Sequence, residues 1–298
     1  FFKGSQSQKN DLLSMAVTYG YQNNIVIKKE IIDGIEFLKG DTLKATDLDT
    51  MKISYSKDIA AGYRADTQPF EDLHHMTQMN GIHWCNHAFE GGQRREENAI
   101  PGFNLIVLDI DNGINMSTAQ MLLSDYKAMF YTTKRSTDDD ERFRILIPMN
   151  YTLELDAKDY KEFMHNIYNW LPFDVDDGTG QRSRKWLSHN GSYEYQDGIL
   201  LDVLPFIPKT SRNEAFKATF NDQESLNNLE RWMINNSADG NRNKMLHRYA
   251  MVLVDAGFDY NSIQSKVTEL NAKTSDPIPE EEIAMTVMKT VGNKLPAI

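Results

Sequence analysis

One segment limits the folds open to this chain more than any other. It is Asn104–Asp111, with the sequence Asn-Leu-Ile-Val-Leu-Asp-Ile-Asp. An apolar run of strand length indicates a β-strand that is buried on both faces. Asn112 and Gly113 follow and end the run. We therefore expect this strand inside a sheet that helices cover, in a chain of 298 residues, which is long enough for two domains.

The rest of the chain predicts an α+β domain followed by a small all-α bundle. Strands are predicted at 25–27, 31–38, 51–55, 82–84, 130–133, 143–148 and in short pieces of 193–207. Helices are predicted at 69–80, 117–128, 156–170, 223–236, 241–256, 259–273 and 279–292. We expect a first domain over 1–207, with 1–50 unassigned, a polar linker over 208–222 and a helical domain over 223–298.

Composition narrows the function classes. The formal net charge of −11 argues against a generic nucleic-acid coat, but it allows a local basic groove. A single cysteine excludes an internal disulfide framework and favours a reducing setting. The chain shows neither a membrane-length apolar run nor a secretory signal pattern. These features predict a cytoplasmic protein without a membrane partner.

The two acids that end the buried strand are the strongest chemical signal. Asp109 and Asp111 are two residues apart, so in a strand they face the same side. Such close like charges favour a cation between them, and Mg²⁺ or Mn²⁺ suits oxygen ligands. Two-metal phosphoryl chemistry is the usual use, and a polar strand end is the alternative. The loop at 173–178 contains further acids and is either a third carboxylate source or an ordinary acidic loop.

Basic residues in two places fit a phosphorylated ligand. Lys134, Arg142 and Arg144 lie around a predicted hairpin, where guanidinium groups suit phosphate oxygens and internal ion pairs are the alternative. Arg182, Arg184 and Lys185 precede Trp186, a combination that fits single-stranded nucleic acid. Trp186 itself is more typical of a core. His189 is either a polar loop residue or a phosphate contact.

Four histidines near Cys85 also suggest zinc by composition. They are His74, His75, His83 and His87. Their spacing matches no zinc site that we recognise.

The order of these motifs resembles the archaeo-eukaryotic primase superfamily, in its phage and plasmid primase-polymerase branch. The first motif of that family is an Asp-x-Asp that ends a core strand, matched by Asp109 and Asp111. The second lies on the next hairpin, matched by 131–136 and 142–148. The third is an acid shortly before a Ser-Arg pair; counting back from Arg184 gives Asp176, with Asp177 as the fallback. The resemblance implies an RRM-like mixed sheet with flanking helices.

One motif departs from the family pattern. Many members carry Ser-x-His or Ser-His in the second motif, whereas this chain has no histidine between Tyr131 and Pro148. Either arginines replace that histidine, or His189 approaches from another strand. The region from Gly240 onward resembles the small helical domain that follows the catalytic domain in such primases.

The resemblance implies an enzyme that makes primers or DNA on a single-stranded DNA template. NTPs or dNTPs would be the substrates, and Asp109, Asp111 and Asp176 would hold two Mg²⁺ or Mn²⁺ ions for nucleotidyl transfer. A phage or plasmid role would place the protein in the host-cell cytoplasm. A helicase, fused after Ile298 or separate, is the implied partner.

Two other functions stay open at this point. A haloacid-dehalogenase-type phosphatase also uses an Asp-x-Asp strand end, but it prefers Thr where Gly113 stands. A replication initiator or origin-binding protein could keep the primase fold and bind DNA without catalysis.

Overall fold

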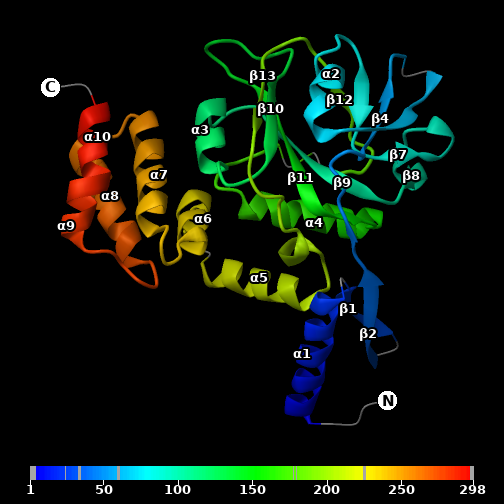
Figure 1. Cartoon of the computed structure of the whole chain (residues 1–298), viewed down its shortest axis with the longest axis horizontal. Coiled ribbons are helices and arrows are strands. Elements are labelled where there is room, and N and C mark those ends of the chain that lie inside the picture. Colours follow the sequence, from blue (N-terminus) through cyan, green and yellow to red (C-terminus); the bar gives the residue numbers. More distant parts are fainter. Residues whose placement is uncertain are drawn as a thin grey trace. The chain divides into compact units, whose positions relative to one another are not determined.

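The chain forms two compact units that alternate along the sequence. The computed structural model describes residues 5–23, 25–32, 35–58, 61–176, 178, 180–223 and 226–295 (Figure 1). Unit 1 consists of the residues up to Asp111 with Asp125–Ile167 and Val175–Asp222. Unit 2 consists of Asn112–Ser124, Tyr168–Asp174 and the residues from Gln223. Residues 112–124 and 168–174, which we expected in the first domain, therefore cluster with the C-terminal helices.

The strand predicted from the apolar run lies in the larger sheet of unit 1, where it pairs with β11 alone among the described strands and not in the interior of the sheet as expected. In the described residues this sheet contains β9 (Phe103–Ile110), β10 (Ala128–Thr132), β11 (Phe143–Leu153), β13 (Tyr193–Gln196) and the short β3 (Lys44–Ala45). The long strand β11 pairs with both β9 and β10, and β13 extends the sheet beyond β10. All eight residues of β9 are buried, as its apolar run predicts.

A second sheet of unit 1 runs in the order β12, β6, β4, β5. Its strands are β12 (Trp186–Leu187), β6 (His83–Cys85), β4 (Met51–Ser56) and β5 (Arg64–Gln68). The strands β7 (Ala88–Phe89) and β8 (Ala99–Ile100) form a separate pair. Every pairing described between these strands is antiparallel. The fold is thus mixed α+β as expected, whereas the sheets themselves are antiparallel rather than mixed.

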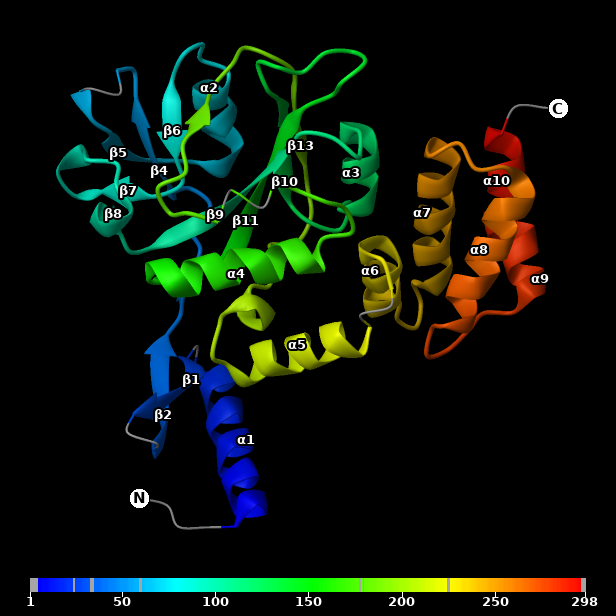
Figure 2. The same cartoon turned by 180° about the vertical axis from the view of Figure 1, so that it is seen from behind.

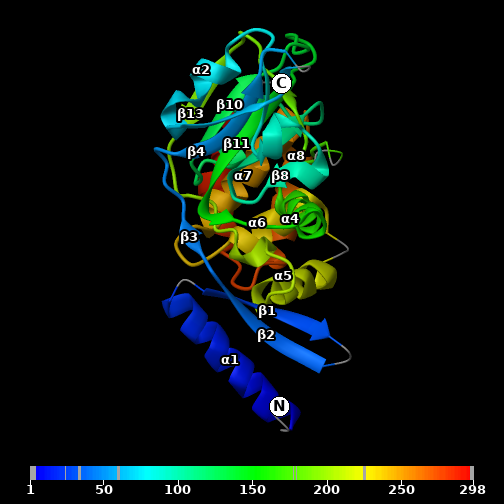
Figure 3. The ribbon, with the colours of Figure 1, turned by 90° about the vertical axis from the view of Figure 1, so that its right-hand side faces the viewer.

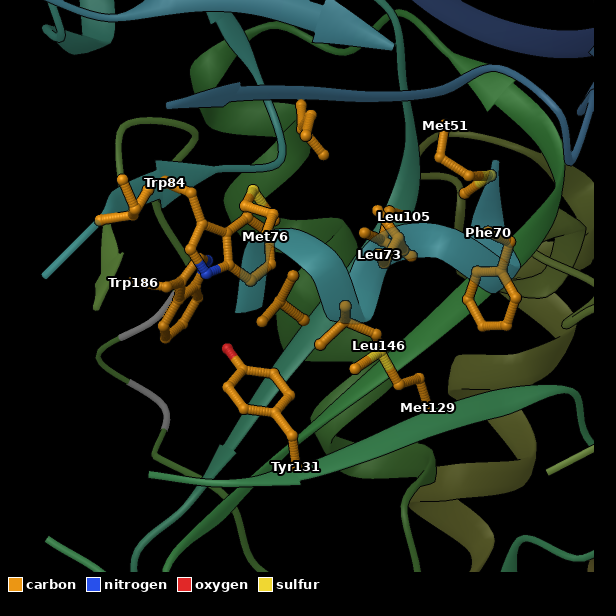
Figure 4. Packing of buried hydrophobic residues seen from close by; sticks show 13 residues of the cluster. Met51, Phe70, Leu73, Met76, Trp84, Leu105, Met129, Tyr131, Leu146 and Trp186 are labelled. Carbon is orange, nitrogen blue, oxygen red and sulfur yellow. The ribbon is translucent and has the colours of Figure 1, made fainter. Parts of the chain in front are cut away.

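One apolar core joins the two sheets. Side chains from β4, β6 and β12 pack against side chains from β9, β10 and β11, and the helix α2 (Leu73–Thr77) contributes to the same cluster (Figure 4). The helix α4 (Ala157–Trp170) packs at the start of β9, where Phe103 meets Phe163 with ring centroids 5.7 Å apart (Figure 2). The inner face of the larger sheet therefore looks toward the second sheet.

The N-terminal part of unit 1 consists of a helix and a β-hairpin. A helix, α1 (Gln6–Gln22), begins with a capping box between Ser5 and Gln8 and lies beside the hairpin of β1 (Ile25–Ile32) and β2 (Ile35–Thr42) (Figure 3). Two strands were predicted in this region, but the predicted second strand at 31–38 combines the end of β1 with the start of β2. The helix was missed because its sequence has no one-sided apolar pattern.

The segment that we expected to be a linker contains a helix. Residues Ser211–Asp222 form α5, which belongs to unit 1. Its sequence is mostly polar, so periodicity gave no signal. Tertiary contacts supply the support instead, because Phe216 packs edge-on against Phe206 with centroids 5.3 Å apart.

Unit 2 is helical. Its helices are α3 (Met116–Leu122), α6 (Asn228–Asn236), α7 (Arg242–Asp255), α8 (Tyr260–Ala272), α9 (Glu280–Ile283) and α10 (Lys289–Lys294), with a π-helical turn at Ala284–Met288 between the last two. The Thr118 hydroxyl of α3 donates to Asp255 of α7 at 2.8 Å. In the part of the chain that the structure describes, no helix combines the length and apolar character that a bilayer span requires.

Candidate active site

The predicted acids lie where strand β9 ends. Asp109 is the penultimate residue of β9 and faces the second sheet, together with Leu105 and Val107 of the apolar core. Its side chain is 9% exposed. Asp111 follows the strand and its side chain is half exposed. Gly113 then turns the chain with a φ of 86°, a conformation that glycine adopts without strain.

A row of three polar side chains crosses the larger sheet at this level. The register places Arg144 of β11 directly opposite Asp109 of β9 and Tyr131 of β10. Arg144 Nε donates to Asp109 Oδ1 at 2.9 Å, and its Nη1 lies 3.4 Å from the Tyr131 hydroxyl. The same Nη1 donates to the carbonyl of Leu187 at 3.0 Å, which ties the row to strand β12 of the second sheet.

Trp186 of β12, in the second sheet, contacts this row. The guanidinium carbons of Arg144 and Arg184 lie 5.1 and 5.3 Å from its ring centroid, within the range of cation–π contacts. Trp186 is buried, and Figure 4 shows the Tyr131 hydroxyl directed toward it. The indole ring therefore holds two guanidinium groups beside Asp109, and its core character agrees with the prediction for Trp186.

A third acid is attached to the end of β9 through the backbone. The N–H of Asp176 donates to the carbonyl of Asp109 at 3.1 Å. The Asp176 carboxylate accepts from Arg184 Nη2 at 3.2 Å, and the same nitrogen lies 4.0 Å from Asp109 Oδ2. The structure thus brings together the three acids that we predicted, Asp109, Asp111 and Asp176. Asp177, the fallback, lies outside the described residues.

Arginine also faces the most exposed of the three acids. Arg142 Nη1 lies 3.5 Å from Asp111 Oδ1, while its Nε donates to Asp140 at 2.9 Å. Arg142 precedes β11 and Arg144 lies within it, and each meets one acid of the Asp-x-Asp motif. Each of the three carboxylates consequently has a guanidinium partner in this conformation.

The surroundings of Asp109 disfavour its ionised form. Burial raises the pKa of Asp109, and the charges of Asp111 and Asp176 raise it further, whereas Arg144 and Arg184 lower it. The net direction is upward. Because both neighbouring acids act on Asp109, the three charges form one coupled group, and a cation that approached them would favour the ionised form.

The donor chemistry of this group fits a hard divalent cation. Carboxylate oxygens are the ligands that Mg²⁺ and Mn²⁺ prefer, and three acids are electrostatically coupled here. In the described residues, however, no three His, Cys, Asp or Glu side chains are close enough together to form a metal site. The guanidinium partners of Asp109 and Asp176 instead neutralise the acids. The metal assignment therefore stays a prediction.

Other predicted residues lie away from the carboxylates. Lys134 is exposed in the loop between β10 and β11. His189 follows β12, and its backbone N–H donates to the carbonyl of Thr77 at 3.0 Å. Within the described ranges, neither side chain has a hydrogen bond or ion pair to the three acids. The structure thus favours arginines over His189 as the neighbours of the Asp-x-Asp motif.

Arg182, which we predicted to bind DNA, is bound to other residues of the protein. Its side chain is 11% exposed and makes an ion pair with Glu96 at 2.8 Å. It also donates to the carbonyls of Glu96 at 2.7 Å and Leu155 at 3.3 Å. Burial raises the pKa of the Glu96 carboxyl, but its hydrogen bonds with the Arg182 side chain and with Ser183 lower it more, so the net pKa is lowered. Arg182 therefore connects two loops, whereas Arg184 faces the acids.

The sequence analysis did not predict that Tyr131 and Arg144 lie side by side in one row with Asp109. The available signal was their equal distance from the hairpin loop, which places Tyr131 and Arg144 opposite each other in an antiparallel pair. The position of β9 relative to that hairpin has no such local signal.

Comparisons with known proteins found a family match over part of the chain and a distant structural similarity. Residues 83–203 match the family model described as the VapE N-terminal domain, a span that is less than half of the chain but contains all the site residues named above. No curated protein matches the chain. Among solved structures, the AEP domain of the cyanophage S-2L primase-polymerase is similar, with 13% identity, a TM-score of 0.32, and coverage of 55% of this chain and 91% of that one.

Proposed function

We propose that the protein is a primase or primase-polymerase that transfers nucleotides onto a primer or first nucleotide along single-stranded DNA. The observation that carries this proposal is the coupled group of Asp109, Asp111 and Asp176, set at the end of a buried strand and surrounded by arginines. The motif order described above and the family match over 83–203 support it.

In this proposal each residue of the site has a distinct task. Asp109, Asp111 and Asp176 would hold Mg²⁺ or Mn²⁺, which supplies activation of the attacking hydroxyl and stabilisation of the leaving pyrophosphate. Arg142 and Arg184 have partly exposed side chains, and their guanidinium groups would bind the triphosphate of an incoming NTP or dNTP. No covalent bond to the protein is required.

Arg144 has a different task because it is buried. Its side chain is 11% exposed and is held by Asp109, Leu187 and Trp186. We infer that Arg144 fixes the orientation of the Asp109 carboxylate and does not contact the triphosphate. The same burial argues against a phosphatase reading, in which Asp109 would have to attack a phosphate as a nucleophile, because Asp109 Oδ1 is occupied by Arg144.

The test is incorporation of labelled NTPs and dNTPs on unprimed and primed single-stranded DNA with Mg²⁺ or Mn²⁺. Asp111→Asn is the decisive variant, because its half-exposed side chain can lose its charge with little effect on folding. Asp49→Ala, which removes an exposed acid elsewhere in unit 1, is the matched control. New oligomers on the unprimed template, lost only in Asp111→Asn, would establish a primase; extension of primed template alone would establish a polymerase.

A second candidate rests on the guanidinium partners of the three acids. If these ion pairs persist when metal is added, the fold would act as a DNA-binding initiator without catalysis. Absence of incorporation on both templates, combined with retained DNA binding, would favour that function. A separate or fused helicase remains the expected partner in either case.

A further inference from the structure

A second cationic cluster lies on the other face of the strand that carries Trp186. Strand β12 is the edge of the second sheet, and Trp186 pairs with Trp84 of β6 on the core side. Side chains alternate along a strand, so His83 and Cys85 of β6 point to the opposite, outer face. Cys85 there packs with Tyr63, and the guanidinium carbon of Arg94 lies 5.9 Å from the Tyr63 ring.

Two cations share this outer face. Burial lowers the pKa of His83, and the charges of Lys185 and Arg94 lower it further. The same two charges act on Cys85, whose pKa is raised by burial. Lys185 precedes Trp186, whose side chain lies in the core, so alternation directs Lys185 to the outer face; Arg94 Nη1 binds the carbonyl of Ser183, two residues before Lys185. We call Arg94 and Lys185 the outer cation pair.

The acids that could neutralise this pair have other partners. Glu96 is bound to Arg182, and Glu97 to Arg95. Within the described ranges, neither Arg94 nor Lys185 forms an ion pair, and both are partly exposed. Arg94 Nη1 donates to the carbonyl of Ser183 at 2.5 Å, while its Nε has no partner among the described residues. Because Nε is buried, the donors that Arg94 can offer a ligand are on the two terminal nitrogens of its guanidinium group.

Arg94 of the outer cation pair is bound to the segment that also carries Arg184, the partner of Asp176. Arg94 binds the carbonyl of Ser183, and the N–H of Ser183 donates to Glu96 at 3.0 Å. The next residue, Arg184, contacts Asp176 and Trp186 on the core side, and Lys185 follows on the outer side. Cations thus flank the edge strand on both of its faces.

We propose that Arg94 and Lys185 bind backbone phosphates of a single-stranded DNA template as it passes around the edge strand β12. A mononucleotide bound at the carboxylates would contact Arg184 but would not span the strand to its outer face. A polymer with regularly spaced phosphates can contact both faces. This inference rests on the proposed function for the identity of the strand, and its electrostatic basis is independent of catalysis.

The test measures binding without metal or nucleotide. A fluorescein-labelled oligothymidylate is titrated with the full chain over a series of KCl concentrations, and log Kd is plotted against log [KCl]. Each lost phosphate contact lowers the slope by about 0.7 for a single strand. We expect that decrease for Lys185→Gln and for Arg94→Gln, and about twice that decrease for the double variant. Arg95→Gln, which changes the net charge equally but removes an ion-paired residue, should leave the slope unchanged.

The variants separate DNA contact from folding. Lys185→Gln removes a side chain that makes no ion pair in the described chain, and Arg94→Lys keeps the charge where Arg94→Gln removes it. A slope that is unchanged in Lys185→Gln and Arg94→Gln, a slope that falls equally in Arg95→Gln, or no binding by the unmodified chain would overturn the inference. If the unmodified chain makes primers while these slopes stay constant, the proposed function holds and the outer cation pair fails. If the slopes fall as expected but the unmodified chain forms no product, the outer cation pair binds DNA and the proposed function fails.

Discussion

Replacing Arg144 by methionine should destabilise the folded protein, because Asp109 is a buried charge. The two side chains are 11% and 9% exposed, and Arg144 Nε is 2.9 Å from Asp109 Oδ1. Removal of one partner of a buried pair costs about 3–5 kcal/mol. Arg144 is the nearer of the two guanidinium groups that face Asp109, because Arg184 Nη2 lies 4.0 Å from Asp109 Oδ2. We therefore expect the free energy of unfolding of Arg144→Met to fall by about that amount at neutral pH.

The pH dependence gives this prediction its direction. The pKa of Asp109 is already raised by burial and by Asp111 and Asp176, and loss of Arg144 removes a charge that lowers it. A folded-state pKa above the unfolded value of about 3.9 means that the folded protein binds the proton more tightly. The stability from protonated Asp109 is therefore complete below the unfolded pKa and is lost as pH rises through the folded pKa. Each further unit of that shift is worth about 1.4 kcal/mol.

Urea unfolding followed by far-UV circular dichroism at several pH values measures both effects. The deficit of Arg144→Met should shrink as pH is lowered from neutral toward the pKa of an ordinary carboxyl. The double variant Asp109→Asn with Arg144→Met should recover most of the lost stability, because it removes the unpaired charge. The reasoning is refuted if Arg144→Met is as stable as the parent, if its deficit does not depend on pH, or if the double variant recovers nothing.

Three further outcomes follow from the described contacts. Arg182→Gln should lower the free energy of unfolding by about 2–3 kcal/mol, because the bonds to Glu96 are lost. The slope of log Kd for DNA against log [KCl] should stay constant, and a changed slope would show that Arg182 contacts DNA. Burial raises the pKa of Cys85 to about 12, so iodoacetamide should label the thiol at mildly alkaline pH only after unfolding, and rapid labelling of the folded chain would contradict its burial. A chain cut after Asp222 should bind the dye ANS, because Thr118 of α3 loses Asp255 and the packing of α7; an ANS-negative, cooperatively folding fragment would disprove this.

The sequence was most informative where local pattern decides the structure. The apolar run before Asp109 has a length that suits only a strand between covering layers, and strand alternation places Asp109 on the inner face. The later helices from 228 onward also show their apolar periodicity directly. In these cases the neighbours in sequence already contain the physical cause.

Partners distant in sequence were not predictable in the same way. Arg182 looks like a nucleic-acid residue because it stands beside Arg184 and Lys185, yet Glu96 lies 86 residues earlier and removes it from the surface. The bond from the Asp176 N–H to the Asp109 carbonyl likewise depends on how a loop returns to the end of β9. The helix α5 depends on its contact with Phe206 rather than on its own composition.

The pairing of Asp109 with Arg144 has a consequence for how the chain finds its fold. Strand β9 is apolar on both faces and strand β11 nearly so, and hydrophobicity alone therefore distinguishes poorly between neighbouring alignments of the two strands. A slip by one residue would turn Arg144 to the opposite face of the sheet and take away the guanidinium group that lies 2.9 Å from Asp109 Oδ1. The acid–arginine pair thus rejects misaligned strands during folding, and the same two residues that organise the site also select the correct alignment of the sheet that contains it.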